Sequence, residues 1–207
     1  MYMNNGDGTF SESVKETTNQ TSFYGMGVDI ADFNNDSYLD YIQVDMDAKD
    51  NRRSKANMAS MNPDLFWSTV NYGFHYQYMH NTLQLNRRIE GDKPFFSNIS
   101  RLSGISSTDW SWGPLLADLD NDGWKDLFIS NGIRREINHR DFFNEIKLRP
   151  MSNDSLLYYT EQMPSEAIAN FTFKNNTDLT FTDVSESWGL DQKNFSNGAT
   201  YADLDND

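Results

Sequence analysis

Short runs of apolar residues recur along the chain, and each run is bounded by glycine, asparagine, aspartate or serine. Some runs alternate with polar residues, as half-buried strands do, and others are continuous, as in buried strands. The pattern predicts strands before and after an Asn-rich turn, and before and after an acidic loop. The predicted strands span residues 82–85 and 171–173, 96–99 and 180–184, 27–31 and 113–117, and 39–44 and 127–130.

These strands belong to a repeat with a period of 85 or 86 residues, in which an acidic segment begins at Asp32, Asp118 and Asp203. A glycine lies five residues before each of these aspartates, and a phenylalanine lies 22 residues before each. Landmarks that keep a fixed register indicate repeated structural units. Four short strands in each unit are typical of β-propeller blades.

The sequence therefore predicts an all-β fold, a partial β-propeller of four-stranded blades with short helical insertions. Asn62 before Pro63 predicts a helix N-terminus, and two more helices are predicted around residues 141–148 and 155–162. The predicted units are a first blade at 1–48, an insertion at 49–80, a second blade at 81–133, a helical insertion at 134–168 and a third blade at 169–207. Because both ends fall inside a unit, we expect a piece of a longer protein.

Composition narrows the possible partners. The 207 residues include 31 acidic and 17 basic side chains, which gives a net charge of −14, and aromatic residues make up 14% of the chain. The aromatic content argues against disorder, and the negative charge argues against a nucleic-acid partner. No apolar run approaches the roughly 18 residues of a membrane span. The absence of cysteine excludes disulfides and thiolate zinc sites.

The acidic loop at residues 118–126 carries aspartate at positions 1, 3, 5 and 9 and glycine at position 6. Calcium binds about 6–8 oxygen atoms, and alternate residues of a tight loop can direct carboxylates toward one centre. The backbone carbonyl of position 7 would add a further ligand. The predicted calcium ligands are Asp32, Asn34, Asp36, Tyr38 and Asp40 in the first loop, Asp118, Asp120, Asp122, Trp124 and Asp126 in the second, and Asp203, Asp205 and Asp207 in the third.

The first loop departs from this pattern at two positions. Asn34 replaces aspartate at position 3, and Ser37 replaces glycine at position 6. One charge is lost and the turn is more strained, so we expect weaker binding there than in the second loop. An EF-hand would require glutamate at position 12 and flanking helices, whereas Gln43 and Ile129 occupy that position between strands. The remaining alternative is that Asp-Asn-Asp-Gly only forms a turn.

Residues 119–127 and 181–190 resemble the FG-GAP/VCBS repeat, the calcium-binding blade of integrin-α-like propellers. The stretches 80–86, 108–114, 130–133 and 162–165 resemble more narrowly the bacterial cartilage-acidic-protein-like branch, which often carries an ASPIC/UnbV domain. The resemblance implies a large exported or surface protein with a propeller, and therefore an extracytoplasmic location. No signal peptide is visible at the start of this chain.

Two functions remain open at this point. The first is a non-catalytic module whose structural calcium supports loops that bind a protein or a glycan. The alternative is a propeller-type polysaccharide hydrolase or lyase, which needs paired carboxylates about 5–9 Å apart across a cleft. Acids outside the loops, such as Asp109 and Glu136, cannot be assigned a catalytic role from the sequence.

Other conspicuous side chains have simpler interpretations. His75, His80 and His139 are expected to pack or form hydrogen bonds, because no nucleophile motif accompanies them. Trp110, Trp112 and Trp124 flank the second acidic loop, where they are expected to pack in the core rather than stack on a sugar.

Overall fold

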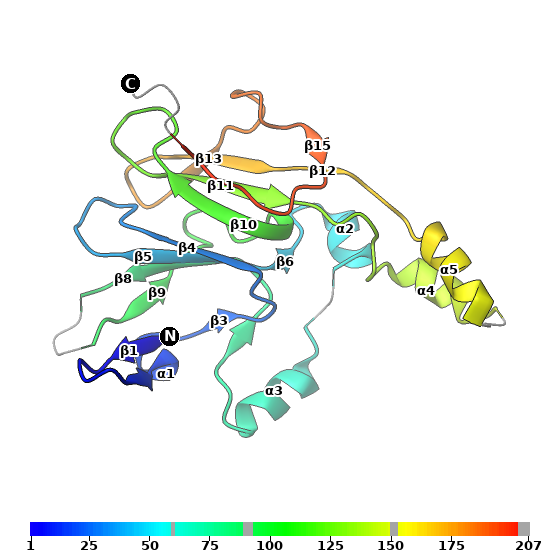
Figure 1. Cartoon of the computed structure of the whole chain (residues 1–207), viewed down its shortest axis with the longest axis horizontal. Coiled ribbons are helices and arrows are strands. Elements are labelled where there is room, and N and C mark those ends of the chain that lie inside the picture. The colour runs from blue at the N-terminus through cyan, green and yellow to red at the C-terminus, as the bar shows by residue number, and fades with distance from the viewer. Residues whose placement is uncertain (59–60, 89–92, 150–152, 203–207) are drawn as a thin grey trace.

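A computed structural model of the chain describes residues 1–58, 61–88, 93–149 and 153–202, and it consists mostly of strands with a few helices. Figure 1 shows the elements in chain order. They are β1 (Tyr2–Asn4), β2 (Phe10–Glu12), α1 (Val14–Thr17), β3 (Thr21–Ser22), β4 (Gly27–Ala31), β5 (Asp40–Val44), β6 (Met46–Asp47), α2 (Asn51–Ala56), α3 (Pro63–Asn71), β7 (Gln77–Tyr78), β8 (Thr82–Asn86), β9 (Phe96–Asn98), β10 (Asp109–Ala117), β11 (Asp126–Asn131), α4 (Arg140–Ile146), α5 (Asn153–Gln162), β12 (Ile168–Ala169), β13 (Phe171–Asn175), β14 (Phe181–Asp183) and β15 (Lys193–Asn194).

Two antiparallel sheets form the body of the molecule. The first has the strand order β4-β5-β8-β9, and the second has the order β14-β13-β11-β10 with β6 added beside the start of β10. All eight predicted strands are present, with ends that differ by a few residues from the predicted ones. The largest difference is β10, which begins four residues before the predicted position 113 because its first residues pair with β6. The prediction of a mainly β structure is therefore confirmed.

Each sheet is assembled from two hairpins that are distant in sequence. In the first sheet, the hairpin β4–β5 pairs with the hairpin β8–β9 through Tyr41 and Gln84. In the second, β10–β11 pairs with β13–β14 through Leu127 and Phe173. Each sheet thus takes one hairpin from one predicted unit and the second hairpin from the next. The predicted unit bounds remain a prediction.

The first of the repeated glycines, Gly27, allows the two sheets to stack closely. A Cβ atom on Gly27 would lie only 2.1 Å from the carbonyl oxygen of Trp112, so β4 approaches β10 at a distance that no side chain permits. A Cβ atom on Gly113 would in turn lie 3.4 Å from Cα of Gly198. Gly27 is therefore a point of close backbone approach, whereas a Cβ atom on Gly198 would meet open space.

Apolar side chains from the facing sheets fill the space between them. The core consists of Phe33, Ile42, Val44, Leu83, Leu85, Ile105, Leu116, Leu127, Ile129, Phe173 and Phe181, all of them buried. Phe33 lies in the first acidic loop and packs against Phe181 of β14 with 5.9 Å between ring centroids. This contact fixes the acidic end of the first sheet against the second.

The insertions contain the predicted helices and one that the sequence pattern did not reveal. The side chain of Asn62 accepts hydrogen bonds from the amides of Asp64 and Leu65, so it caps α3 as predicted. The helix α2, which was not predicted, begins after the capping residue Asp50. In Figure 1, α4 and α5 project from the end of the sheets opposite the acidic loops. None of the helices in the described ranges is long and apolar enough to cross a bilayer.

Candidate metal centre

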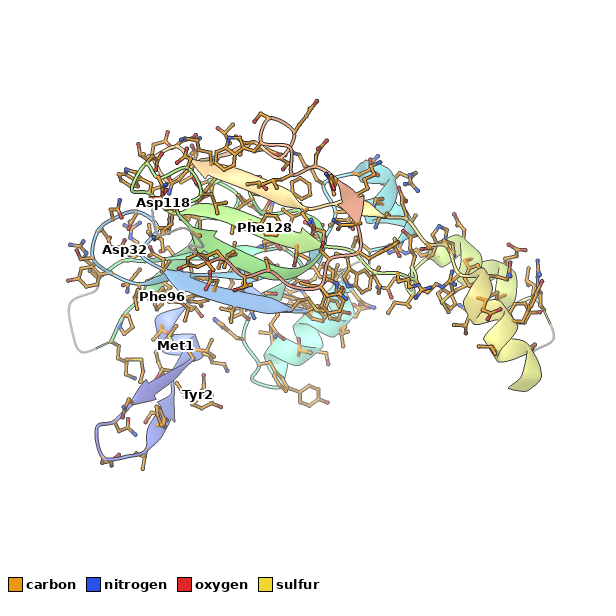
Figure 2. The ribbon with its side chains drawn as sticks, turned by 45° about the horizontal axis from the view of Figure 1, so that its top comes forward. Met1, Tyr2, Asp32, Phe96, Asp118 and Phe128 are labelled. Atoms are coloured by element: carbon orange, nitrogen blue, oxygen red, sulfur yellow. The ribbon has the colours of Figure 1, made fainter. Side chains whose placement is uncertain are left out.

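The acidic loops lie at the same end of the two sheets, as the labels of Asp32 and Asp118 in Figure 2 show. We name residues 32–40 loop one and residues 118–126 loop two. Loop one connects β4 to β5, and loop two connects β10 to β11. Both loops therefore join two antiparallel strands, which confirms that the flanking elements are strands and not the helices of an EF-hand.

Backbone amides fold loop two around its first aspartate. The amides of Asp122 and Gly123 donate to the two carboxylate oxygens of Asp118, at 3.1 and 2.8 Å. Gly123 has a φ of +87°, the left-handed conformation that glycine adopts without strain. The side chains of Asp118, Asp120 and Asp126 consequently converge, and one oxygen from each lies within 4.8 Å of the others. This spacing and this set of oxygen atoms suit a hard divalent cation.

Loop one has the same backbone path. The amides of Asp36 and Ser37 donate to Asp32 at 3.0 and 2.7 Å, and the amide of Asp36 also approaches Asn34 Oδ1 at 3.3 Å. Ser37 has a φ of +71°, so a serine holds the left-handed conformation that Gly123 holds in loop two. Among the described residues, the carboxylates of loop one do not form a close cluster like that of loop two.

The ninth position of each loop is a completely buried aspartate. Asp126 Oδ1 accepts the amide of Asn175 at 2.9 Å, and Oδ2 accepts the amide of Leu119 at 3.1 Å. Asp40 Oδ1 likewise accepts the amide of Asn86 at 2.8 Å, and the amide of Phe33 lies near the same carboxylate, but Asp40 Oδ2 forms no hydrogen bond of normal geometry. A carboxylate oxygen at 0% exposure without a bond of normal geometry is costly to retain, and a nearby positive charge would offset that cost.

Burial changes the acidity of both aspartates. It raises the pKa of Asp40 to about 6, which the nearby amides of Asn86 and Phe33 offset only in part. Burial also raises the pKa of Asp126. The neighbouring loop carboxylates push both values in the same direction, so each loop is an electrostatically unfavourable arrangement without a positive charge.

A basic side chain from a neighbouring strand or turn contacts each loop. Lys174 of β13 forms ion pairs with Asp120 and with Asp122, the latter at 3.1 Å. These carboxylates raise the pKa of Lys174. Arg88 lies 3.4 Å from a carboxylate oxygen of Asp36 and 4.1 Å from the centre of the Tyr38 ring. Each loop thus has a tethered positive charge that a metal ion would have to displace or share.

The structure brings together only some of the predicted ligands. Asp118, Asp120 and Asp126 form the close group, whereas Asp122 directs one oxygen to the amide of Trp124 and the other to Lys174. The amide of Tyr38 donates to Asp36, while the tyrosine ring lies under Arg88. The predicted ligands of the third loop, Asp203, Asp205 and Asp207, lie outside the described residues.

Sequence reasoning missed an asparagine that ends the strand before each Asn-rich turn. Asn4, Asn86 and Asn175 each accept, through the side-chain oxygen, the amide two residues further on. Asn86 and Asn175 also donate their own amides to the ninth residue of the adjacent acidic loop. Asn4 and Asn175 each lie 28 residues before the first aspartate of an acidic segment, so the repeat register could have located them, whereas Asn86 lies 32 residues before Asp118 and is out of that register.

The histidines and tryptophans have structural contacts. His139 accepts the amide of Phe142 at the start of α4, and His75 bonds with Thr18. Trp110 is 3% exposed and packs with Met46, Ala48 and Met58, as expected for a core residue. The indole of Trp112 donates to the carbonyl of Gly132 at 2.6 Å.

The acids outside the loops that the sequence left unassigned lie in a buried ionic cluster. Arg53 of α2 bonds with both oxygens of Asp109 at 2.6 and 2.9 Å, with Glu136 at 2.6 Å and with Glu166 at 2.9 Å. Both Asp109 and Glu136 are less than one-tenth exposed. The guanidinium of Arg53 joins three carboxylates and holds the insertions against β10. Asp109 and Glu136 are thus held in ion pairs with Arg53 rather than facing each other across an open cleft.

The comparison with protein families finds a known class of repeat at the start of the chain, in the part that contains loop one. The FG-GAP-like repeat matches residues 1–42, a span that ends just after loop one. The chain therefore contains an FG-GAP-like repeat. Comparisons with curated proteins and with solved structures gave no match.

Proposed function

We propose that this chain is a calcium-binding, β-propeller-like module that binds a protein or a glycan without catalysing a reaction. The FG-GAP-like repeat at residues 1–42 supports the propeller-like architecture. The two four-stranded arrangements β4-β5-β8-β9 and β10-β11-β13-β14 would be neighbouring blades. The narrower resemblance to the bacterial cartilage-acidic-protein-like branch supports an exported or surface location.

The completely buried carboxylate of Asp40, whose Oδ2 atom forms no hydrogen bond of normal geometry, is the observation that carries the calcium proposal. A loop that served only as a turn would not need a carboxylate at 0% exposure with one oxygen that lacks a hydrogen bond of normal geometry. In loop two, the oxygen atoms of Asp118, Asp120 and Asp126 would hold the ion. In loop one, Asp32, Asn34, Asp36 and Asp40 would do so.

Calcium would serve a structural role in this proposal. It would neutralise the carboxylates of each loop and fix the ends of strands that belong to both sheets. Because the unfolded chain lacks these preformed loops, binding free energy becomes folding free energy. The hydrolase or lyase alternative is not favoured, because Asp109 and Glu136 are committed to Arg53.

Thermal unfolding of the chain in EDTA, in magnesium and in calcium tests the proposal. A cation that binds only the folded state stabilises it by about 2.7 kcal/mol at a hundred times its dissociation constant. We expect a higher midpoint in calcium than in magnesium, because calcium tolerates more oxygen ligands and irregular geometry. A folded chain with the same midpoint in all three solutions would refute the calcium site.

Two variants sharpen this test. The loop-two variant, which combines Asp118→Asn with Asp120→Asn, should lose most of the calcium-dependent rise. Asp191→Asn changes an exposed aspartate outside both loops and should keep it. A partner screen with immobilised glycans and with candidate proteins, in calcium and in EDTA, would then test the binding role.

A further inference from the structure

Asn175 occupies a position that links the two acidic loops. It ends β13 and is 2% exposed. Its side-chain nitrogen donates to the carbonyl of Phe33 in loop one and to the carbonyl of Lys125 in loop two, both at 2.9 Å. Its backbone amide donates to Asp126 at 2.9 Å. One buried side chain therefore joins segments that are 142 and 50 residues away in sequence.

A second contact joins the loops at the surface. The side chain of Asn35 in loop one donates to the carbonyl of Gly123 in loop two at 3.0 Å. Asn35 has a φ of +56°, so the backbone of loop one turns this side chain outward in a conformation that asparagine tolerates. The loops are thus connected by one buried and one exposed bridge.

The repeat supplies an internal comparison for Asn175. Asn86 has the equivalent place at the end of β8, donates its amide to Asp40 at 2.8 Å, and donates its side chain to the carbonyl of Leu39 at 3.2 Å. Among the described residues, Asn86 forms no bond with a second acidic loop. Both asparagines therefore support the acidic loop next to them. Within the described ranges, only Asn175 also bonds with a residue of the other loop, Phe33.

The bridged carbonyls are placed where they would respond to a bound cation. Phe33 lies between the first and third positions of loop one, and Lys125 lies between the seventh and ninth positions of loop two. A cation that fixes these ligand positions also fixes the intervening carbonyls. Because the two carbonyls share the donors of one buried amide, order imposed on one loop reduces the conformational freedom left to the other.

We propose that Asn175 is a positioning residue that couples the two cation sites, so that calcium in either loop raises the affinity of the other. This inference rests on the proposed function, because it requires both loops to bind. Coupling between two sites is reciprocal, and coupling energies in proteins commonly change affinity by about fivefold or more.

Site-resolved calcium titration of the isotopically labelled chain by NMR would test the coupling. The amides of Ser37 and Gly123 donate to the first aspartates of loops one and two at 2.7 and 2.8 Å, so their signals report on each loop separately. In the background that keeps Asn175, we expect loop one of the loop-two variant to bind calcium at least about fivefold more weakly than loop one of the wild type. In an Asn175→Ala background, the same change at loop two should alter loop-one affinity less than twofold.

Two further variants distinguish coupling from general damage. Asn86→Ala removes the equivalent support from loop one, and it should weaken that site while retaining the response to loop two. Asn35→Gly removes only the exposed bridge without adding backbone strain, and it should reduce the coupling even if Asn175→Ala fails to fold.

The outcomes separate the two proposals. If neither amide signal responds to calcium, both the calcium sites and their coupling are refuted. If both signals respond, and loop-one affinity is the same with and without an intact loop two, the sites stand and the coupling alone is refuted. If loop-one affinity depends on loop two as strongly in Asn175→Ala and in Asn35→Gly as in the wild type, the role given to Asn175 and Asn35 in the coupling is refuted.

Discussion

Substitution of Asp40 by asparagine is expected to change stability in opposite directions with and without calcium. Asp40 is fully buried, its Oδ2 atom forms no hydrogen bond of normal geometry, and burial raises its pKa from the ordinary 3.8 to about 6. Because the folded state holds the proton more tightly, the unfolding free energy in EDTA should fall as the pH rises from about 4 to 6. Above this window, the ionised group destabilises the fold by about 3 kcal/mol.

Asp40→Asn removes this cost in EDTA. The amide oxygen can still accept the hydrogen bond from Asn86, but the new NH2 group would be buried without an assigned acceptor, which costs about 1–2 kcal/mol. We therefore expect the variant to be about 1–2 kcal/mol more stable than the wild type at pH 7.5 in EDTA. In a chain of this size, the gain corresponds to a rise of about 2–8 °C in the melting temperature.

Calcium should reverse the order of stability. If both loops bind calcium as proposed, the wild type would gain binding free energy at both, whereas the variant would lack a charged ligand in loop one and gain at loop two alone. Urea unfolding in EDTA and in calcium measures both differences. The matched control is Asp126→Asn, which should be less stable than the wild type in EDTA because both Asp126 oxygens accept backbone amides.

Two results would contradict this reasoning. An Asp40→Asn variant clearly less stable than the wild type in EDTA would mean that the ionised carboxylate is not the costly group. An equal calcium response in the variant and the wild type would mean that Asp40 does not contact the cation.

Three further substitutions test other features of the structure. Gly27→Ala should cost about 1–3 kcal/mol in urea unfolding, because a Cβ atom would overlap the neighbouring backbone, whereas Gly198→Ala meets open space and should cost less. Lys174→Met should tighten calcium binding severalfold, as measured by calorimetry, because it removes a positive charge that competes with the ion for Asp120 and Asp122. The control Lys125→Met breaks no ion pair among the described residues and should change the affinity less. Ser37→Gly should raise the free energy of unfolding by about 1 kcal/mol in EDTA, because glycine adopts the left-handed backbone conformation of residue 37 without the strain that serine carries. An unchanged urea midpoint would argue against such strain.

The local parts of this structure could be predicted from the sequence. Each acidic loop is contained in nine consecutive residues, and its flanking strands follow from short apolar runs. The helix at Asn62 and Pro63 also depends on adjacent residues alone. Such features are readable because the interacting groups are neighbours in the chain.

The contacts between loops and between sheets could not be predicted in the same way. The repeat located Gly27, but only the stacked sheets reveal the carbonyl of Trp112 that excludes a side chain there. The ion pair of Lys174 with loop two and the cluster around Arg53 join residues more than 50 positions apart. Nothing in the local pattern of Lys174 or Arg53 indicates which carboxylate lies nearby.

The assembly of each sheet from two separated hairpins has a consequence for folding. Pairing of Tyr41 with Gln84, or of Ile129 with Phe171, must close a chain segment of about 40 residues. The hairpins can form rapidly by themselves, and the slower step is the search that joins them. The entropy of closing a flexible segment grows only with the logarithm of its length, and doubling the segment costs about 0.6 kcal/mol. The insertions can therefore lengthen at small entropic cost, provided that the contacts around Arg53 that hold them against β10 are kept.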